Sequence, residues 1–289
     1  MNVAVGGHAS LSSSVAPVPA DGTHKIIEVS HLDKVFVTVR NERIHALNDI
    51  SLSVAEREFV TIVGPSGCGK STLLKVLSGL LAATRGSVLL AGTPVDRPRR
   101  DIGIVFQNPV LLPWRTVMDN VMLPVEVQGL PVAASRQRAH DLLAMVGLAD
   151  FETKYPMELS GGMQQRAAIS RALVHDPNIL LMDEPFGALD AMTREQMNLD
   201  LQRIWMEAGK TVILITHSIP EAVFLGDRVV VMTSRPGRIA RLVEVDFPRP
   251  RSIDVMGEPE FGRLTSEIRR LLYNRTDLDP HLASGGGIS

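Results

Sequence analysis

The first hydrophobic pattern along the chain predicts strands. From Ile26 to about Gly92, apolar and polar residues come close to alternating, most clearly over 35–39 and 50–54. A spacing of two residues is typical of strands that bury one face. A short apolar run, Phe59–Val63, then ends at a cluster of glycines, and leucines at helical spacing follow over Lys70–Leu80. These segments predict a strand, a glycine-rich loop and a helix in direct succession.

The middle and the last part of the chain have different patterns. Between about Asn108 and Leu159 the spacing is mostly helical, and amphipathic helices are predicted over 116–128 and 132–146. After Ser160, helices alternate with continuous apolar runs of strand length. These runs lie at 179–182, 212–216 and 229–232. Such runs are typical of parallel strands buried on both faces, so the chain is predicted to be an α/β protein.

Three parts of the chain are expected. Residues 1–24 are rich in Ala, Ser, Val, Pro and Gly and lack the features of a secretory signal, so a disordered leader is predicted. Residues 25–247 are predicted to form the main domain, with a helical subdomain at about 108–160. Residues 248–289 are predicted to be a C-terminal extension with one helix, near 260–273.

Composition narrows the classes of function. The 289 residues include 30 Lys+Arg and 32 Asp+Glu, for a formal net charge of -2. This balance argues against a dominant electrostatic grip on nucleic acid, and no nucleic-acid partner is predicted. The single cysteine, Cys68, permits no internal disulfide and indicates a reducing, cytosolic compartment. No apolar run reaches the length of a membrane span, so any work at a membrane is expected from its water side.

The glycine cluster carries the first chemical motif. Residues 64–71, called the phosphate loop below, fit G-x-x-x-x-G-K-S/T between the predicted strand and helix. Glycines let backbone N–H groups turn toward phosphates, and the helix N-terminus adds a favourable partial charge. Lys70 is expected to reach the β- and γ-phosphates, and the Ser71 hydroxyl to bind Mg²⁺. Cys68 is interpreted as a small residue of this loop and not as a catalytic thiol. The residues predicted here to bind ATP are Gly64, Pro65, Ser66, Gly67, Cys68, Gly69, Lys70, Ser71 and Thr72.

Two carboxylates follow the apolar run at 179–182. At the tip of a buried strand, Asp183 would lie beside the phosphate loop and hold Mg²⁺ directly or through water. Glu184 would point toward the γ-phosphate, where a carboxylate can orient and deprotonate the attacking water. The alternative is that both acids only cap the next helix. The phosphate loop in the same chain disfavours it, because a nucleotide site requires both parts.

A second glycine turn precedes a helix predicted over 164–174. Ser160, Gly161 and Gly162 offer free backbone donors at the N-terminus of this helix and form a second phosphate-binding surface. A single compact monomer seldom needs two cradles for a γ-phosphate. Two copies facing head to tail would use both, because each copy would complete the nucleotide pocket of the other. A homodimer is therefore predicted.

With these motifs in this order, the sequence resembles the ATP-binding-cassette (ABC) ATPases from about Ile26 to Arg241. The resemblance implies a P-loop NTPase fold of the ABC ATPase type, with an antiparallel β subdomain and a helical subdomain. It implies an ATP-driven translocase with ATP and Mg²⁺ as cofactors. Ser71, Gln107 and Asp183 would then hold the metal, and Glu184 and His217 would be the catalytic residues. Phe36 would stack on adenine, and the loop across the dimer interface would include Ala188, Leu189 and Asp190.

Three positions depart from the common pattern of that family. Met163 stands where Gln is frequent, Gly187 where Ser is common, and Phe36 where Tyr is commoner. Stacking on a base survives without the tyrosine hydroxyl. None of these changes removes a group that the chemistry needs, so a competent ATPase is expected.

The segment after Gln107 predicts a contact with a membrane subunit. In the family this segment forms the groove for the permease, and here its apolar run with an aromatic and an arginine has the composition of a binding surface. The residues predicted to touch the permease are Leu111, Leu112, Trp114 and Arg115. The alternative is an ordinary loop that buries its own apolar residues.

The strings at 111–117 and 234–239 resemble the nitrate/sulfonate/taurine importer branch of the family. The branch implies an ATP-hydrolysing subunit at the cytoplasmic face of the inner (plasma) membrane, which drives uptake of a small anion. It also implies a permease and a periplasmic or lipid-anchored solute-binding protein as partners. An exporter cassette and a soluble ABC-type ATPase outside transport remain as alternatives. A non-enzymatic cassette would be expected to lack Lys70, Asp183 or Glu184.

Overall fold

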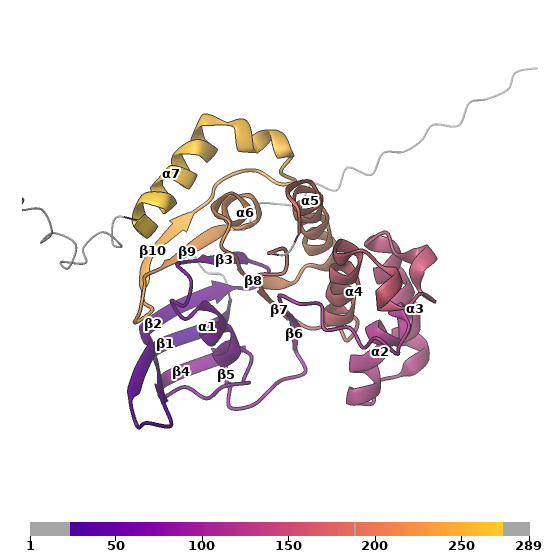
Figure 1. Ribbon diagram of the computed structural model, residues 1–289, viewed down its shortest axis with the longest axis horizontal. Coiled ribbons are helices and arrows are strands. Elements are labelled where there is room, and N and C mark those ends of the chain that lie inside the picture. The colour runs from indigo at the N-terminus through magenta and orange to yellow at the C-terminus, as the bar shows by residue number, and fades with distance from the viewer. Residues whose placement is uncertain (1–23, 188, 274–289) are drawn as a thin grey trace, which may run out of the picture.

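The computed structural model describes residues 24–187 and 189–273. Two sheets lie side by side, and a group of helices lies beyond the larger sheet (Figure 1). The predicted α/β class, with an antiparallel part and a helical part, is confirmed. Residues 1–23 of the predicted leader, Ala188 of the predicted interface loop and residues 274–289 of the predicted extension lie outside the described residues.

The smaller sheet is antiparallel and follows the order β2-β1-β4-β5. Its strands are β1 (Lys25–Val37), β2 (Arg43–Ala55), β4 (Arg85–Leu90) and β5 (Thr93–Pro94). The strand predicted over 35–39 ends earlier, at Val37. The backbone of Thr38 instead donates to the carbonyl of Glu42, and this turn leaves the side chain of Val39 exposed.

The larger sheet is parallel except at one edge and follows the order β10-β9-β3-β8-β7-β6. Its strands are β3 (Phe59–Val63), β6 (Ile102–Val105), β7 (Ile179–Asp183), β8 (Thr211–Ile215), β9 (Arg228–Met232) and β10 (Ile239–Glu244). β10 is the antiparallel edge strand. Because β3, β8 and β7 are parallel neighbours, their carboxyl ends share one edge of the sheet, and the candidate site lies there.

Helices cover both faces of the larger sheet, as its all-apolar strands require. Alternate residues of β3 point to different cores: Val60 packs with α1 (Lys70–Leu77) and the smaller sheet, whereas Phe59 packs on the opposite side. That second core includes α5 (Ala191–Ala208) and α6 (Ile219–Leu225). The helix predicted over 70–80 ends at Leu77, because the chain turns at Gly79, where φ is +72°.

The helical part begins with a capped helix. Thr116 Oγ1 accepts a hydrogen bond from the Asp119 amide at 3.1 Å and starts α2 (Val117–Gln128). α3 (Val132–Met145), two short 3-10 turns (Ala149–Phe151 and Pro156–Glu158) and α4 (Gly161–Leu173) follow. α4 begins three residues before the predicted start at 164. It packs against α2 and α3, so the helical layer continues past residue 160 (Figure 1).

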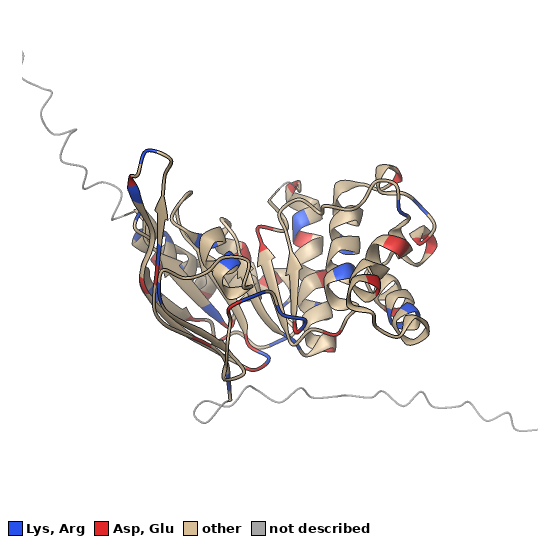
Figure 2. Ribbon diagram, turned by 90° about the horizontal axis from the view of Figure 1, so that it is seen from below, with Lys and Arg blue, Asp and Glu red and all other residues tan. Residues whose placement is uncertain are grey.

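The chain returns to the larger sheet in its last described part. A 3-10 turn (Ile253–Gly257) precedes α7 (Pro259–Tyr273), which packs on α6. The buried guanidinium of Arg251 donates to the carbonyl oxygens of Val223, Phe224 and Gly226 and so caps the C-terminal end of α6. Among the described residues, no helix is long and apolar enough to cross a membrane. In the view of Figure 2, acidic and basic residues are interspersed over the visible elements.

Candidate nucleotide-binding site

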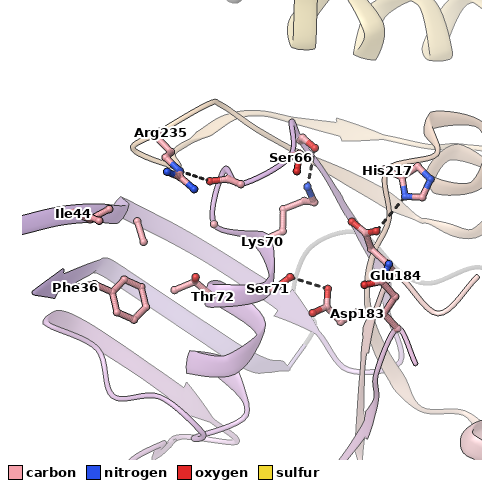
Figure 3. Close-up of a pocket in the computed structure, with 15 residues that line it drawn as sticks. Phe36, Ile44, Ser66, Lys70, Ser71, Thr72, Asp183, Glu184, His217 and Arg235 are labelled. Atoms are coloured by element: carbon pink, nitrogen blue, oxygen red, sulfur yellow. Dashed lines mark hydrogen bonds and ion pairs between the residues drawn. The ribbon is translucent and has the colours of Figure 1, made fainter. Parts of the chain in front are cut away.

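A cavity of about 610 Å³ opens where β3, β7 and β8 end. It is lined by Phe36, Ile44, Ala46, Gly64, Ser66, Gly67, Gly69, Lys70, Ser71, Thr72, Gln107, Asp183, Glu184, His217 and Arg235 (Figure 3). Most residues predicted from the sequence to bind ATP, metal or water are therefore brought together. Pro65 and Cys68 belong to the phosphate loop but do not line the cavity.

The phosphate loop wraps around the Lys70 side chain. Lys70 Nζ donates hydrogen bonds to the carbonyl oxygens of Gly64 at 2.8 Å and Pro65 at 3.1 Å, so its ammonium group is held inside the loop. Gly69 has a φ of 101°, and a Cβ there would lie 2.7 Å from the carbonyl oxygen of Ala46. Only glycine fits this position, because both the backbone conformation and the neighbouring strand exclude a side chain.

Cys68 is part of the core beneath this loop. Its side chain is buried among the residues between the two sheets, and burial raises the pKa of its thiol. A thiol kept in its neutral form is a poor nucleophile. These observations support its interpretation as a packing residue.

A hydroxyl and a carboxylate meet at the predicted metal position. Ser71 Oγ donates to Asp183 Oδ1 at 3.0 Å, and Gln107 lines the same cavity. Burial raises the pKa of Asp183, while the hydrogen bond from Ser71 opposes that shift. Within the described ranges, no group of three or more His, Cys, Asp or Glu side chains is placed to hold a metal ion. The oxygen donors fit Mg²⁺, which takes one or two protein ligands and completes its shell with phosphates and water.

Glu184 and His217, the predicted catalytic residues, meet in the cavity. Glu184 Oε2 lies 3.2 Å from His217 Nδ1. The backbone of Glu184 adopts a φ of 47°, in the left-handed region, and its amide donates to the Ile215 carbonyl of β8. This sharp turn after β7 lets the neighbouring residues Asp183 and Glu184 both line the cavity. Backbone strain of this kind is typical of functional sites.

The opposite end of the cavity is apolar. Phe36 and Ile44 are paired across β1 and β2, and both line the cavity. The Phe36 ring is 38% exposed, so it is not a core residue, and Lys34 Nζ lies over it at 5.2 Å from the ring centroid. The sequence reasoning missed Ile44 and Ala46. A hairpin register that pairs Ile44 with Phe36 was the signal that could have found the first of them.

The second glycine turn lies outside this cavity. Ser160 Oγ accepts a hydrogen bond from the Met163 amide at 3.3 Å, so Ser160 is the N-cap of α4 and is exposed together with Gly161. A Cβ at Gly162 would lie 3.0 Å from Thr193 Cγ2, on the first turn of α5. Asp190, which was predicted to lie in the interface loop, is the N-cap of that helix. The turn and the start of α5 thus form one surface, separate from the chain's own nucleotide cavity.

The predicted permease segment is held in place by Asn120, which the sequence reasoning missed. This buried side chain donates to the carbonyl oxygens of Leu112, Arg115 and Thr116 and accepts from the Leu112 amide. Trp114 is 71% exposed, while Leu111 and Leu112 are half-buried. Arg115 is paired with Glu126 at 2.7 Å. The segment therefore presents Trp114 from a fixed loop.

A parallel sheet with a phosphate loop, a hydroxyl–carboxylate pair and a Glu–His pair in one cavity defines a nucleotide-hydrolysing P-loop ATPase. Comparison with known proteins agrees with this class of protein. A family profile described as ABC transporter matches residues 47–187. The chain belongs to the ABC transporter family and is an ATP-binding ATPase subunit.

Two relatives show the extent of the similarity. The taurine import ATP-binding protein TauB of Rhizobium johnstonii is 46% identical over 260 residues, covering 88% of this chain and 98% of that protein. The nitrate import ATP-binding protein NrtD of Synechococcus elongatus is 46% identical over 246 residues, covering 84% of this chain and 89% of that protein. A solved dimeric, post-hydrolysis ATP-binding cassette bound to ADP and Pi is similar with a TM-score of 0.67 and 35% identity, covering 77% of this chain and 100% of that one.

Proposed function

We propose that this chain is the ATP-hydrolysing subunit of an ABC importer that takes up a small anion such as an aliphatic sulfonate, taurine or nitrate. The names of the taurine and nitrate import relatives support the substrate class. The observation that carries the ATPase chemistry is the meeting of Lys70, Asp183 and Glu184 in one cavity. The substrate itself would be read by other subunits, because an ATPase cassette contributes only the energy.

The cavity residues that were predicted from the sequence have proposed roles in hydrolysis. Lys70 and the amides of the phosphate loop bind the β- and γ-phosphates, and Phe36 stacks on adenine. Glu184 accepts a proton from the attacking water, and His217 holds Glu184 and the γ-phosphate in place. Ser71, Gln107 and Asp183 would hold Mg²⁺, which supplies charge stabilisation for the phosphates when bound.

The separation of Ser160 from the cavity supports a head-to-tail homodimer. In such a dimer, Ser160, Gly161 and Gly162 of one copy complete the nucleotide pocket of the other, and the loop containing Leu189 and Asp190 lies at the interface. The dimeric state of the similar ADP-bound cassette supports this arrangement. ATP would then close the dimer and hydrolysis would release it, a two-state change that can drive a membrane subunit.

The remaining partners follow from the importer proposal. Trp114, together with Leu111, Leu112 and Arg115, would contact the permease at the cytoplasmic face of the inner membrane. A periplasmic or lipid-anchored solute-binding protein would deliver the anion to that permease. The chain would act as a peripheral subunit.

The experiment that tests the proposal is uptake by vesicles that contain the chain, the permease and the solute-binding protein from neighbouring reading frames. Taurine, an alkanesulfonate and nitrate are offered in turn, with ATP supplied on the cassette side. We expect inward, ATP-dependent uptake of one of these anions and no uptake with Lys70→Ala. Outward transport would favour an exporter, and failure of the chain to associate with any permease would favour a soluble ATPase.

The dimer is tested separately by gel filtration. Glu184→Gln should elute as a dimer with ATP, and adding Ser160→Glu should return it to the monomer, because the acid repels the γ-phosphate of the partner's nucleotide. Ser266→Glu, on the exposed face of α7, is the matched control and should leave the dimer intact. A Ser160→Glu protein with wild-type dimerisation and turnover would contradict the proposal.

A further inference from the structure

Arg235 is the charged residue of the cavity to which the nucleotide chemistry above assigns no role. It lies in the turn Thr233–Arg238 between β9 and β10, which reaches back over the phosphate loop (Figure 3). Arg235 Nε donates to the carbonyl oxygen of Gly67 at 2.9 Å. Gly67 has a φ of +72°, so the arginine holds the loop at a residue with an unusual backbone conformation.

The turn that carries Arg235 is anchored by its backbone. The Thr233 amide donates to the Arg238 carbonyl at 2.9 Å, and the Arg238 amide donates to Thr233 Oγ1 at 3.1 Å. The Gly237 amide donates to the Ala46 carbonyl, and a Cβ at Gly237 would lie 2.0 Å from the Cys68 carbonyl oxygen. The turn is therefore packed directly on the phosphate loop, and the position of Arg235 does not depend on its own side chain.

The guanidinium of Arg235 differs from those of Arg228 and Arg249, which are paired with acidic side chains. Arg228 is paired with Glu58, and Arg249 with Asp227. In the part of the chain that the structure describes, no carboxylate lies within ion-pair distance of Arg235, and its side chain makes one hydrogen bond, to Gly67. Arg235 thus adds a second positive charge to the lining of the cavity that contains Lys70.

We propose that Arg235 is a further phosphate-binding residue of this site. It would donate one N–H to the carbonyl oxygen of Gly67 and its other N–H groups to the phosphate oxygens of the nucleotide. The inference rests on the proposed function of the cavity. A planar guanidinium that forms several charge-assisted hydrogen bonds is suited to phosphate oxygens. It complements Lys70, which acts as a point charge from inside the loop. Arg235 therefore adds affinity for nucleotides that carry a phosphate chain.

The test is equilibrium binding of ATP, ADP and adenosine to the wild type, Arg235→Gln and Arg235→Lys. We expect Arg235→Gln to bind ATP and ADP about tenfold more weakly, the scale for loss of a charge-assisted hydrogen bond, and adenosine unchanged. The ATP affinity of Arg235→Lys should lie between those of the wild type and Arg235→Gln, because lysine keeps the positive charge but lacks the planar guanidinium with its several N–H donors. The deficit should shrink at high salt, which screens an exposed charge. In turnover, KM for ATP should rise more than kcat falls.

Arg238→Gln is the matched control. Arg238 is exposed in the same turn, does not line the cavity and contributes its backbone amide to the turn. This variant should bind ATP like the wild type. Wild-type ATP affinity in Arg235→Gln would overturn the inference and leave the proposed function intact, whereas a wild-type chain that binds no ATP would overturn the proposed function itself. Equal weakening of ATP and adenosine binding would mean that Arg235 only supports the fold of the loop, which also overturns the inference.

Discussion

Glu184 Oε2 and His217 Nδ1 lie 3.2 Å apart, although 33 positions separate the two residues in the chain. The parallel pairing of β7 and β8 brings them together, because each residue follows the carboxyl end of its strand. A histidine at this distance orients the carboxylate by a hydrogen bond. The pair is therefore expected to act as a unit in hydrolysis.

The first prediction concerns Glu184. Glu184→Gln should bind ATP with wild-type affinity but hydrolyse it about 100-fold more slowly or worse, because the amide cannot take a proton from water. Phosphate release and equilibrium binding of ATP would measure the two effects independently. Glu207→Gln, on the exposed face of α5, should leave both unchanged. Hydrolysis at the wild-type rate in Glu184→Gln would remove Glu184 from the proposed mechanism.

The second prediction concerns Lys70. Its ammonium group is buried in the phosphate loop and bonded to two loop carbonyls, so Lys70→Ala removes both a charge for the phosphates and two internal contacts. Tight binding of ATP should be abolished. Thermal unfolding of the same sample distinguishes loss of the phosphate-binding charge from loss of the fold, since a cooperative transition shows that the protein is folded. A folded Lys70→Ala variant with unchanged ATP affinity would contradict the assignment.

The parts of the site that were predictable from sequence are those built by adjacent residues. The phosphate loop runs from a strand directly into a helix, so its motif contains its own structural context. Asp183 and Glu184 were found for the same reason, because an apolar run ending in two acids marks the tip of a buried strand. The pattern also predicted the position of α7, whose apolar residues recur at helical spacing.

The parts that were not predictable depend on contacts between distant segments. Arg235 reaches Gly67 across 168 positions, and Ala46 lines the cavity because β2 runs beside the phosphate loop. β6 has only four residues, one of them Gly103, and so is too short for the hydrophobic period of a strand to be recognised in the sequence. Asn120 lies within the amphipathic helix predicted over 116–128, where its polar side chain gave no sign that it is fully buried and organises a loop by hydrogen bonds.

The third prediction concerns Trp114. Its side chain is 71% exposed on a loop that Asn120 fixes, so Trp114→Ala should leave the fold and the soluble ATPase activity unchanged. Association with the permease should weaken strongly, because a large exposed aromatic is the typical anchor of an interface. Co-purification with the permease measures this. Val127→Ala is the control, since Val127 is also an exposed apolar residue, on α2. Equal co-purification of Trp114→Ala and the wild type would refute the contact.

The fourth prediction concerns Glu221 on α6, which is 3% exposed. Burial raises the pKa of its carboxyl to about 7; the charge of Glu184 adds to the shift, and the hydrogen bond with the Thr216 side chain and the charge of Arg194 oppose it. Between its ordinary pKa of 4.5 and about 7, the folded chain holds a proton on this group that the unfolded chain has lost. By linkage, the free energy of unfolding contributed by Glu221 falls as the pH rises through this window.

Glu221→Gln should therefore be more stable than the wild type at about pH 8, by up to about 3 kcal/mol, and this advantage should largely disappear near pH 4.5. Glutamine keeps the size of the side chain and can still hydrogen-bond Thr216, so the substitution changes mainly the charge. Urea denaturation at both pH values measures the difference, and other carboxyl groups cancel because they titrate alike in both proteins. Glu207→Gln, at an exposed position, should show no such pH-dependent advantage. An advantage for Glu221→Gln that is equal at both pH values would show that Glu221 does not titrate in this window.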